Sequence, residues 1–184
     1  KTNKTESNLK PEVAIFVDEK AYLNNPRGSE YCHSVNRIRI AMGNTGIPYN
    51  LYMVEDAKSV IKNYKTAIFP APLPSENGEN EVELCKKYRI PYLATTKEKP
   101  WYSTDELREI LVSKGVHCYN SDGNVIYCGN GFLGAHAKTT GEVKITLPKF
   151  SKIKALQGSK NVNTASNEIV LNMKQYETVL LEIE

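Results

Sequence analysis

The 184-residue sequence lacks several features that would assign it to a functional class at once. No run of apolar residues approaches the ~18 that a membrane-spanning helix needs. The 24 Lys and Arg residues nearly balance the 21 Asp and Glu residues, and they are spread along the chain rather than gathered in a run or on a helix face. We therefore predict no membrane span and no nucleic-acid-binding groove.

Cysteine is scarce, and its spacing matches no C-x-x-C pattern of a zinc site or redox enzyme. No His, Cys or Asp cluster has metal-ligand spacing either, so we predict no metal site. Cys118 and Cys128 leave two alternatives open. They form a disulfide across a hairpin with its tip at residues 121–124, or they are partly buried free thiols. The second is favoured because cross-strand disulfides are strained.

The beginning of the chain is polar. It opens on Lys1, without a charged-then-apolar leader, which is typical of a mature product or of a piece cut from a larger chain. Residues 1–11 end in Pro11 and contain few apolar side chains. We predict a linker or a disordered lead-in over this segment.

Residues 13 to 119 alternate between buried-strand patterns and helical patterns. The last of the helices opens with a capping box at Ser103 and Glu106 and ends at Gly115. Strands that alternate with helices predict a parallel sheet with right-handed crossovers, which is a flavodoxin-like or Rossmann-like α/β fold. The predicted strands are 13–18, 48–54, 66–69, 90–95 and 116–119, and the predicted helices are 29–43, 57–64, 79–88 and 103–115.

The pattern changes after residue 124, beyond which no segment has a helical period. Short strands separated by turn residues predict a small antiparallel β-domain. We therefore divide the chain into a linker over 1–11, an α/β domain over 12–128 and an all-β domain over 129–184. The strands predicted in the last part are 132–137, 143–147, 153–156, 169–173 and 178–183.

The segment Gly129-Asn-Gly-Phe-Leu-Gly134 matches the G-x-G-x-x-G fingerprint of dinucleotide-binding turns. In that fingerprint the third glycine opens a helix whose amides hold the pyrophosphate. Here residues 135–141 leave room for under two helical turns, and Phe150-Ser-Lys152 stands where an acid is expected ~20 residues later. The motif also follows the last predicted parallel strand instead of the first. We predict no dinucleotide and no other cofactor, and a glycine-rich turn into the β-domain.

Four residues make a candidate ligand pocket at the carboxyl ends of the predicted parallel strands, where open α/β sheets bind ligands. Asp18 ends the first strand, Thr95 and Thr96 close the fourth, and Pro100 presents Trp101 in the loop that follows. The alternatives are structural. An acid at a strand end commonly caps the next helix, and an aromatic ring commonly packs a helix against a sheet.

Several stretches match a known domain arrangement. They include Gly46-Ile-Pro-Tyr-Asn-Leu-Tyr52, Tyr64-Lys-Thr-Ala-Ile-Phe69 and Arg89-Ile-Pro-Tyr-Leu-Ala-Thr95. Through them, residues 13–120 resemble the class I glutamine amidotransferase-like domain that follows the catalytic barrel in several glycoside hydrolases, including β-galactosidase-type enzymes. The tail resembles the small β-domain that ends such chains, in Gly131–Ala137, Gly141–Pro148 and Tyr176–Leu181.

The amidotransferase machinery itself is missing from the sequence. An active enzyme keeps a nucleophilic Cys on a glycine-flanked turn and a His-x-Glu pair, because the Cys needs its His as base and the His needs the carboxylate. This chain has Leu93-Ala-Thr-Thr-Lys97 at that turn, and none of His33, His117 and His136 has Glu two residues later. The resemblance therefore implies an accessory region without catalytic residues.

The same resemblance implies partners and a location. The chain would belong to a glycoside hydrolase whose catalytic barrel lies elsewhere in the parent protein, and it would be periplasmic or extracellular. Its expected partners are the catalytic domain of the parent chain, a second copy in a homo-oligomer, and carbohydrate.

A second hypothesis comes from the residues alone. The chain is then a stand-alone α/β protein that binds or hydrolyses a small molecule or a sugar at the carboxyl edge around Asp18, Thr95 and Trp101. Converging acids with perturbed pKa values would favour this hypothesis, whereas a flat apolar surface would favour the accessory region.

Overall fold

The computed structural model describes residues 9–18, 30–70, 81–96, 98–157 and 162–184. Most of the predicted linker, residues 1–8, lies outside the described residues. So do residue 29 of the helix predicted over 29–43 and the first two residues of the helix predicted over 79–88. The chain forms two compact units. The α/β unit comprises Glu12–Met42 and Tyr49–Val116, and the β unit comprises Lys1–Pro11, Gly43–Pro48 and His117–Glu184.

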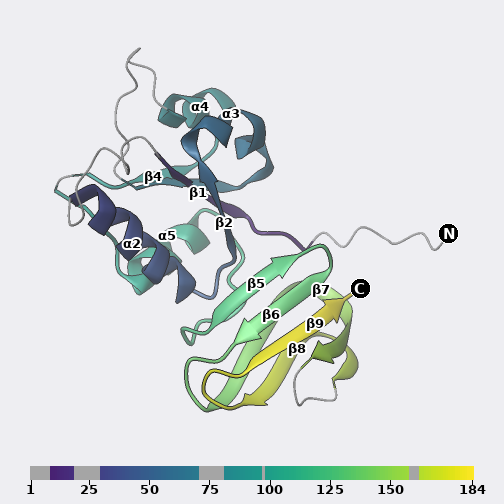
Figure 1. The fold of residues 1–184 in the computed structure, drawn as a ribbon. Helices are drawn as coiled ribbons and strands as arrows, with labels where there is room; N and C mark the ends of the chain where they lie inside the picture. The colour runs from purple at the N-terminus through teal and green to yellow at the C-terminus, as the bar shows by residue number, and fades with distance from the viewer. Residues whose placement is uncertain (1–8, 19–29, 71–80, 97, 158–161) are drawn as a thin grey trace. The chain divides into compact units, whose positions relative to one another are not determined.

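A four-stranded parallel sheet is the centre of the α/β unit, in the order β2-β1-β3-β4 (Figure 1). All five residues of β1 are buried, as expected for a central parallel strand that is covered on both faces. The strands are β1 (Val13–Val17), β2 (Tyr49–Met53), β3 (Thr66–Phe69) and β4 (Tyr92–Ala94).

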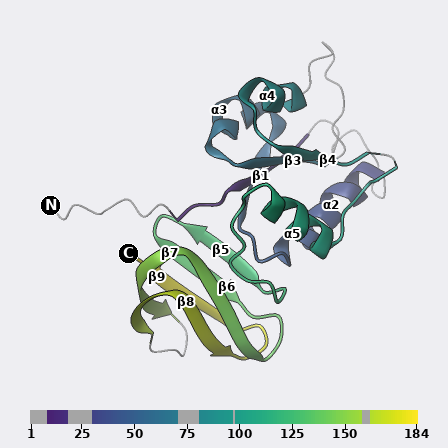
Figure 2. The same cartoon turned by 180° about the vertical axis from the view of Figure 1, so that it is seen from behind.

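Helices cover both faces of this sheet (Figure 2). Phe16 and Phe69 stack on one face with ring centroids 5.3 Å apart, in one buried cluster with Ala57 of α3 and Cys85 of α4. Helices α2 and α5 lie on the opposite face. The helical segments are α2 (Glu30–Gly43), η1 (Val54–Asp56), α3 (Ala57–Val60), η2 (Ile61–Asn63), α4 (Glu81–Tyr88) and α5 (Thr104–Ser113).

The predicted fifth parallel strand over 116–119 is wrong. Val116 and Tyr119 are buried, and this apolar pattern produced the prediction. Their backbone groups, however, pair outside the parallel sheet, because Val116 N–H donates to Leu111 O and Tyr119 N–H donates to Gly46 O. Tyr119 O in turn accepts from Thr146 N–H in the β unit.

The β unit is a five-stranded antiparallel sheet in the order β5-β6-β9-β7-β8. Alternate residues point into one core, as a period of two requires. Examples are Ile126, Leu133 and Leu181. The α/β fold followed by an antiparallel sheet confirms the predicted fold class. The strands are β5 (Val125–Gly129), β6 (Phe132–His136), β7 (Gly141–Gln157), β8 (Asn163–Met173) and β9 (Thr178–Ile183).

Two strands predicted separately, 143–147 and 153–156, are parts of the single long strand β7. Its pairing with β8 shifts register between Thr146 and Ser151, around Pro148. Proline has no N–H to donate to a ladder and is tolerated at such bulges. The turn-forming residues were thus correctly recognised, but they bend the strand instead of ending it.

The glycine motif forms the β5–β6 hairpin. Its turn residues, Asn130 and Gly131, both have positive φ, +50° and +84°. This is the combination that a two-residue type I′ turn demands and that Asn-Gly supplies. A strand and not a helix follows the turn, since Phe132 begins β6 and pairs with Gly129.

The less favoured alternative for Cys118 and Cys128 required a hairpin with its tip at residues 121–124, whereas the described hairpin in this region, β5–β6, turns at residues 130–131. Cys118 lies outside the strands, and its thiol donates to Asn120 O over 3.4 Å. Cys118 and Cys128 are both partly buried cysteines outside any disulfide, which is the alternative that the sequence favoured. The division into a linker over 1–11, an α/β domain over 12–128 and an all-β domain over 129–184 stays a prediction.

Candidate functional site

The carboxyl edge of the parallel sheet holds the residues that the sequence selected. Ile15 of β1 is level with Ile68 of β3, which is level with Leu93 of β4. The three strands therefore end together, and Asp18 and Thr95 follow two of them. Because β3 lies between β1 and β4 and neighbouring strands are ~4.8 Å apart, those two ends are separated by about 10 Å.

Thr95 is built into the packing between β4 and α2. It is buried, and its N–H donates to Phe69 O at 3.1 Å, which continues the β3–β4 pairing. Its hydroxyl lies 2.8 Å from the hydroxyl of Ser34, which is also buried, and Ser34 Oγ donates to Pro100 O at 2.5 Å. A hydroxyl has a single proton, so Thr95 is the donor to Ser34. The Thr95 proton thus points to another hydroxyl, which is no general base.

Thr96 closes a local turn. Its N–H donates to Lys99 O at 3.0 Å, and its hydroxyl accepts from Lys99 N–H at 3.1 Å. Short hydroxyl side chains commonly satisfy turn backbones in this way. Thr96 therefore shapes the loop between β4 and α5.

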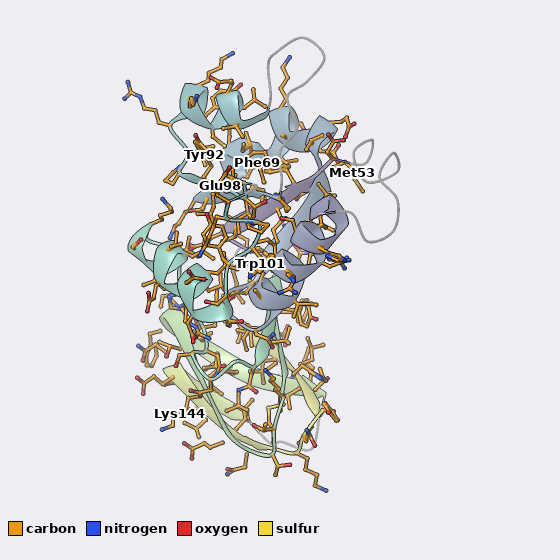
Figure 3. The ribbon with its side chains drawn as sticks, turned by 90° about the vertical axis from the view of Figure 1, so that its left-hand side faces the viewer. Met53, Phe69, Tyr92, Glu98, Trp101 and Lys144 are labelled. Atoms are coloured by element: carbon orange, nitrogen blue, oxygen red, sulfur yellow. The ribbon has the colours of Figure 1, made fainter. Side chains whose placement is uncertain are left out.

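Trp101 is the exposed aromatic of this loop, with 44% of its surface accessible. Trp101 is labelled in Figure 3. The guanidinium carbon of Arg37 in α2 lies 4.3 Å from its ring centroid, which is a cation–π contact. Arg37 and Ser34 are three residues apart and so share one face of α2. This face of α2 therefore contacts both Thr95, through Ser34, and Trp101 in the loop after β4, through Arg37.

A charged group fixes the far end of the same loop. Glu106 accepts from Ser103 N–H at 2.8 Å, while Ser103 Oγ accepts from Glu106 N–H at 3.2 Å, which completes the predicted capping box. Lys99 Nζ lies 2.6 Å from the other carboxylate oxygen. The hydrogen bonds from Lys99 and Ser103 lower the pKa of Glu106 from 4.5 to about 2. The carboxylate holds the loop to the start of α5.

Sequence reasoning missed Ser34 and Arg37, although they contact two of the four selected residues. Their three-residue spacing in a predicted helix shows that they share a face, but nothing in the sequence identifies that face as the one toward β4. Asp18 is partly buried directly after β1. The hypothesis that Asp18, Thr95, Thr96 and Trp101 line one ligand pocket stays a prediction.

Other reactive groups lie elsewhere. The Cys85 thiol is buried in α4, and burial raises its pKa to about 12, so it stays protonated. In the β unit, His117 Nε2 donates to Thr146 O at 2.7 Å and His136 Nδ1 is 2.8 Å from Thr178 Oγ1. No group of three or more His, Cys, Asp or Glu side chains suited to a metal ion occurs within the described ranges. No helix in the part of the chain that the structure describes is long and apolar enough to cross a membrane.

Comparison with known proteins gives matches in structure only. No protein-family model matches the sequence, and no curated protein matches it. Among solved structures, a β-galactosidase from Bacillus circulans sp. alkalophilus matches with a TM-score of 0.62 at 11% identity, over 95% of this chain and 41% of that one. A catalytic mutant of a GH42 β-galactosidase from G. stearothermophilus matches with a TM-score of 0.60 at 12% identity, over 95% and 40%.

A third match is a GH42 exo-carrageenase from Bacteroides ovatus, with a TM-score of 0.53 at 12% identity, over 95% of this chain and 29% of that one. The chain thus spans about two fifths of the length of the β-galactosidases. The predicted resemblance to a region of β-galactosidase-type glycoside hydrolases is confirmed at the level of the fold. At this identity the fold is what the chains share.

Proposed function

We propose that the chain is a non-catalytic accessory region of a glycoside hydrolase whose catalytic barrel lies outside these 184 residues. One observation carries the proposal: 95% of the chain matches about 40% of β-galactosidase chains, among them a GH42 enzyme. A (β/α)8 barrel needs eight parallel strands, and the described parallel sheet has four. The chain therefore corresponds to a part other than a barrel.

The geometry at the carboxyl edge supports the non-catalytic role. At the turn where an amidotransferase would carry its nucleophile, this chain has Thr95, which is buried and donates its proton to Ser34. A hydroxyl nucleophile needs a base that removes this proton. The arrangement serves packing between β4 and α2.

The natural size of the gene product tests the proposal. We would blot source cells with an antibody raised against this chain, which has a mass of 20.7 kDa. The expected result is a band several times larger, with catalytic acids encoded in the additional sequence. A single band near 20.7 kDa would overturn the accessory role.

We further propose that the edge of the parallel sheet makes contacts between subunits. Strand β2 is an edge strand, and Leu51 and Met53 expose apolar side chains on the same side of it. Exposed edges of this kind pair with or pack against partners unless they are protected. The occupant in this proposal is a second copy of the chain.

Sedimentation of the purified chain tests this contact. Leu51→Lys is expected to convert an oligomer into a monomer, because a charge would be desolvated in the contact. Val112→Lys, at a comparably exposed position on α5, is the matched control and is expected to sediment as the parent chain does. A monomeric parent chain, or the same effect from both variants, would overturn the β2 contact.

A periplasmic or extracellular location belongs to the same proposal and is supported by the resemblance to β-galactosidase-type enzymes. Fractionation of source cells with the same antibody tests it. The signal is expected in the periplasmic or culture fraction, and a signal confined to the cytoplasmic fraction would contradict it.

The rival function, a stand-alone ligand-binding or hydrolytic protein, is favoured by one observation, the exposed ring of Trp101 beside Arg37. Trp101 is the single tryptophan of the chain. A small band on the blot, together with sugar-dependent changes in tryptophan fluorescence that Arg37→Ala abolishes, would establish the rival.

A further inference from the structure

The outer face of the β unit carries exposed aromatic rings on adjacent strands. Along β5, β6 and β9 the inward residues form the core, and the alternate residues face outward. Strands β5, β6 and β9 are neighbours in the sheet (Figure 1). Tyr127 of β5 pairs with Gly134 of β6, which pairs with Leu180 of β9, so these three residues form one row across the outer face. Tyr127 is 64% exposed.

Glycine makes the middle of this row flat. A Cβ atom at Gly134 would lie 3.7 Å from Tyr127 Cβ and 3.8 Å from its Cδ2 atom, so the Tyr127 side chain leans over the glycine. An aromatic side chain beside a cross-strand glycine is a recognised device in sheets. The result is a shallow surface bordered by the Tyr127 ring.

A second exposed aromatic ring, that of Tyr176, lies beside the next row of the sheet, Val125–His136–Thr178. Tyr176 is 69% exposed and stacks on His136 of β6, with ring centroids 6.3 Å apart and an interplanar angle of 23°. His136 is paired with Thr178 across the sheet, and its Nδ1 atom is 2.8 Å from Thr178 Oγ1. His136 is two residues from Gly134 on the same strand, so the two rows are neighbours on one face.

The backbone at Tyr176 is strained to hold this ring. Its φ is +64°, a region in which turns normally place Gly or Asn. The turn is fixed by Tyr176 N–H, which donates to Ala137 O at 2.8 Å, and by Glu177 N–H, which donates to Lys174 O at 3.0 Å. The turn thus keeps a large, exposed ring at a backbone conformation that Gly or Asn would adopt at lower cost.

The chemistry of the surface indicates the ligand. The rows Tyr127–Gly134–Leu180 and Val125–His136–Thr178 contain no Lys, Arg, Asp or Glu, and the acidic residue Glu182 lies in the next row of this face, paired with Phe132. Within the described part of the chain, neither the Tyr127 nor the Tyr176 hydroxyl has a hydrogen-bond partner. Tyrosine offers an apolar face together with a polar hydroxyl. In these two rows, stacking faces with available hydroxyls and without charged side chains fit a neutral sugar, which has C–H faces and hydroxyl edges.

We propose that the outer face of β5, β6 and β9, with Tyr127, His136 and Tyr176 as contacts, binds a neutral carbohydrate chain. We call this surface the tyrosine platform. Carbohydrate binding by this surface is a proposal separate from the accessory role proposed above. Only the choice of a galactose polymer as the probe rests on that role. The platform is an affinity site that holds a polysaccharide, and no bond is made or broken there.

Affinity electrophoresis of the 184-residue chain in gels that contain galactan, a neutral galactose polymer, tests the platform. Galactan is expected to retard the chain, and carrageenan, its sulfated counterpart, is expected to retard it less. Tyr127→Ala and Tyr176→Asn should each weaken retardation at least tenfold. Asn is chosen because it tolerates positive φ. Phe150→Ala, which removes a 70% exposed ring of the same unit outside the platform, should have no effect.

Gly134→Thr separates binding from folding. The added Cβ would meet Tyr127 at ordinary contact distance, and a β-branched residue suits a strand, so the variant is expected to fold at least as well as the parent. Its side chain would fill the flat part of the platform and abolish retardation. Retained retardation in a folded Gly134→Thr chain would overturn the proposal.

A substitution in the other unit is a further control, because Trp101 belongs to the α/β unit. Trp101→Ala is expected to leave retardation by galactan unchanged. No retardation by galactan, or retardation that Trp101→Ala abolishes and Tyr127→Ala does not, would overturn the proposal. A band near 20.7 kDa on the blot of source cells would overturn the accessory role but would not change the measured binding of galactan. A failure of the accessory role and a failure of the tyrosine platform are therefore distinguishable.

Discussion

Thr66 is a buried residue with a polar hydroxyl group in an apolar environment. It is fully buried in β3, and among the residues that the structure describes its hydroxyl has no hydrogen-bond partner. Burying an unpaired hydroxyl costs about 1–3 kcal/mol. Valine has the same branched shape without the hydroxyl. Thr66→Val is therefore expected to raise the free energy of unfolding by about 1 kcal/mol in urea titrations.

Thr45 is the matched control for this substitution. It is equally buried, but its hydroxyl accepts from Ile47 N–H at 3.1 Å. Thr45→Val would leave that N–H unpaired and is expected to lower the free energy of unfolding by about 1–2 kcal/mol. Equal effects from the two substitutions would show that the Thr66 hydroxyl is satisfied.

Gly46 is required by both its backbone and its neighbour. Its φ is +72°, and a Cβ atom there would lie 1.7 Å from Asn120 O. Gly123 also has positive φ, +83°, but its Cβ would come only within 3.9 Å of Asn44 O. Gly46→Ala is expected to cost more than about 3 kcal/mol of unfolding free energy, and Gly123→Ala about 1 kcal/mol. Similar losses in denaturation would show that the Asn120 loop moves aside freely.

At the scale of the element, α5 depends on an ionised carboxylate at its start. Because the pKa of Glu106 is lowered to about 2 in the folded protein, its stabilising effect is complete above pH 4.5 and is lost as the pH falls toward 2. Glu106→Gln keeps an acceptor for Ser103 N–H but loses the ion pair with Lys99. The variant is expected to be less stable than the parent at pH 7 and nearly equal to it near pH 2.

Urea unfolding at several pH values measures this difference. Glu109→Gln, an exposed position on the same helix, is the matched control. A difference between the parent chain and Glu106→Gln that stays constant from pH 7 to pH 2 would contradict the assignment of the stability to the ionised Glu106.

The helices and strands also show which parts of the fold could be predicted from the sequence and which could not. Periodicity predicted the four parallel strands and α5, including the capping box at Ser103, because their local signals agree with the fold. It failed at residues 116–119, where the pattern of buried side chains resembles that of a strand. The backbone there pairs instead with Leu111 in the preceding helix and with Gly46, which is far away in the sequence. The contacts of Ser34 and Arg37 also depend on tertiary packing that local patterns do not contain.

At the scale of the whole molecule, strand pairing predicts how fragments behave. A fragment over 129–184 lacks β5 and Tyr119, whereas a fragment over 117–184 keeps both. Ile126 and Tyr119 are buried in the core of the β unit. Loss of this burial is expected to lower the free energy of unfolding of the shorter fragment by about 3–5 kcal/mol relative to the longer one. Thermal unfolding followed by circular dichroism measures it, and equal midpoints would show that β5 is dispensable.

The position of β9 has a consequence for how the protein is made. This strand lies between β6 and β7, yet the ribosome synthesises it after all four of the other strands of its sheet. The β5–β6 hairpin can form as soon as it emerges, within about 1–10 μs, but until β9 is translated β6 and β7 both lack a neighbour. The nascent chain therefore carries two open strand edges through most of the synthesis of this unit, and a premature stop before Thr178 would leave them open permanently.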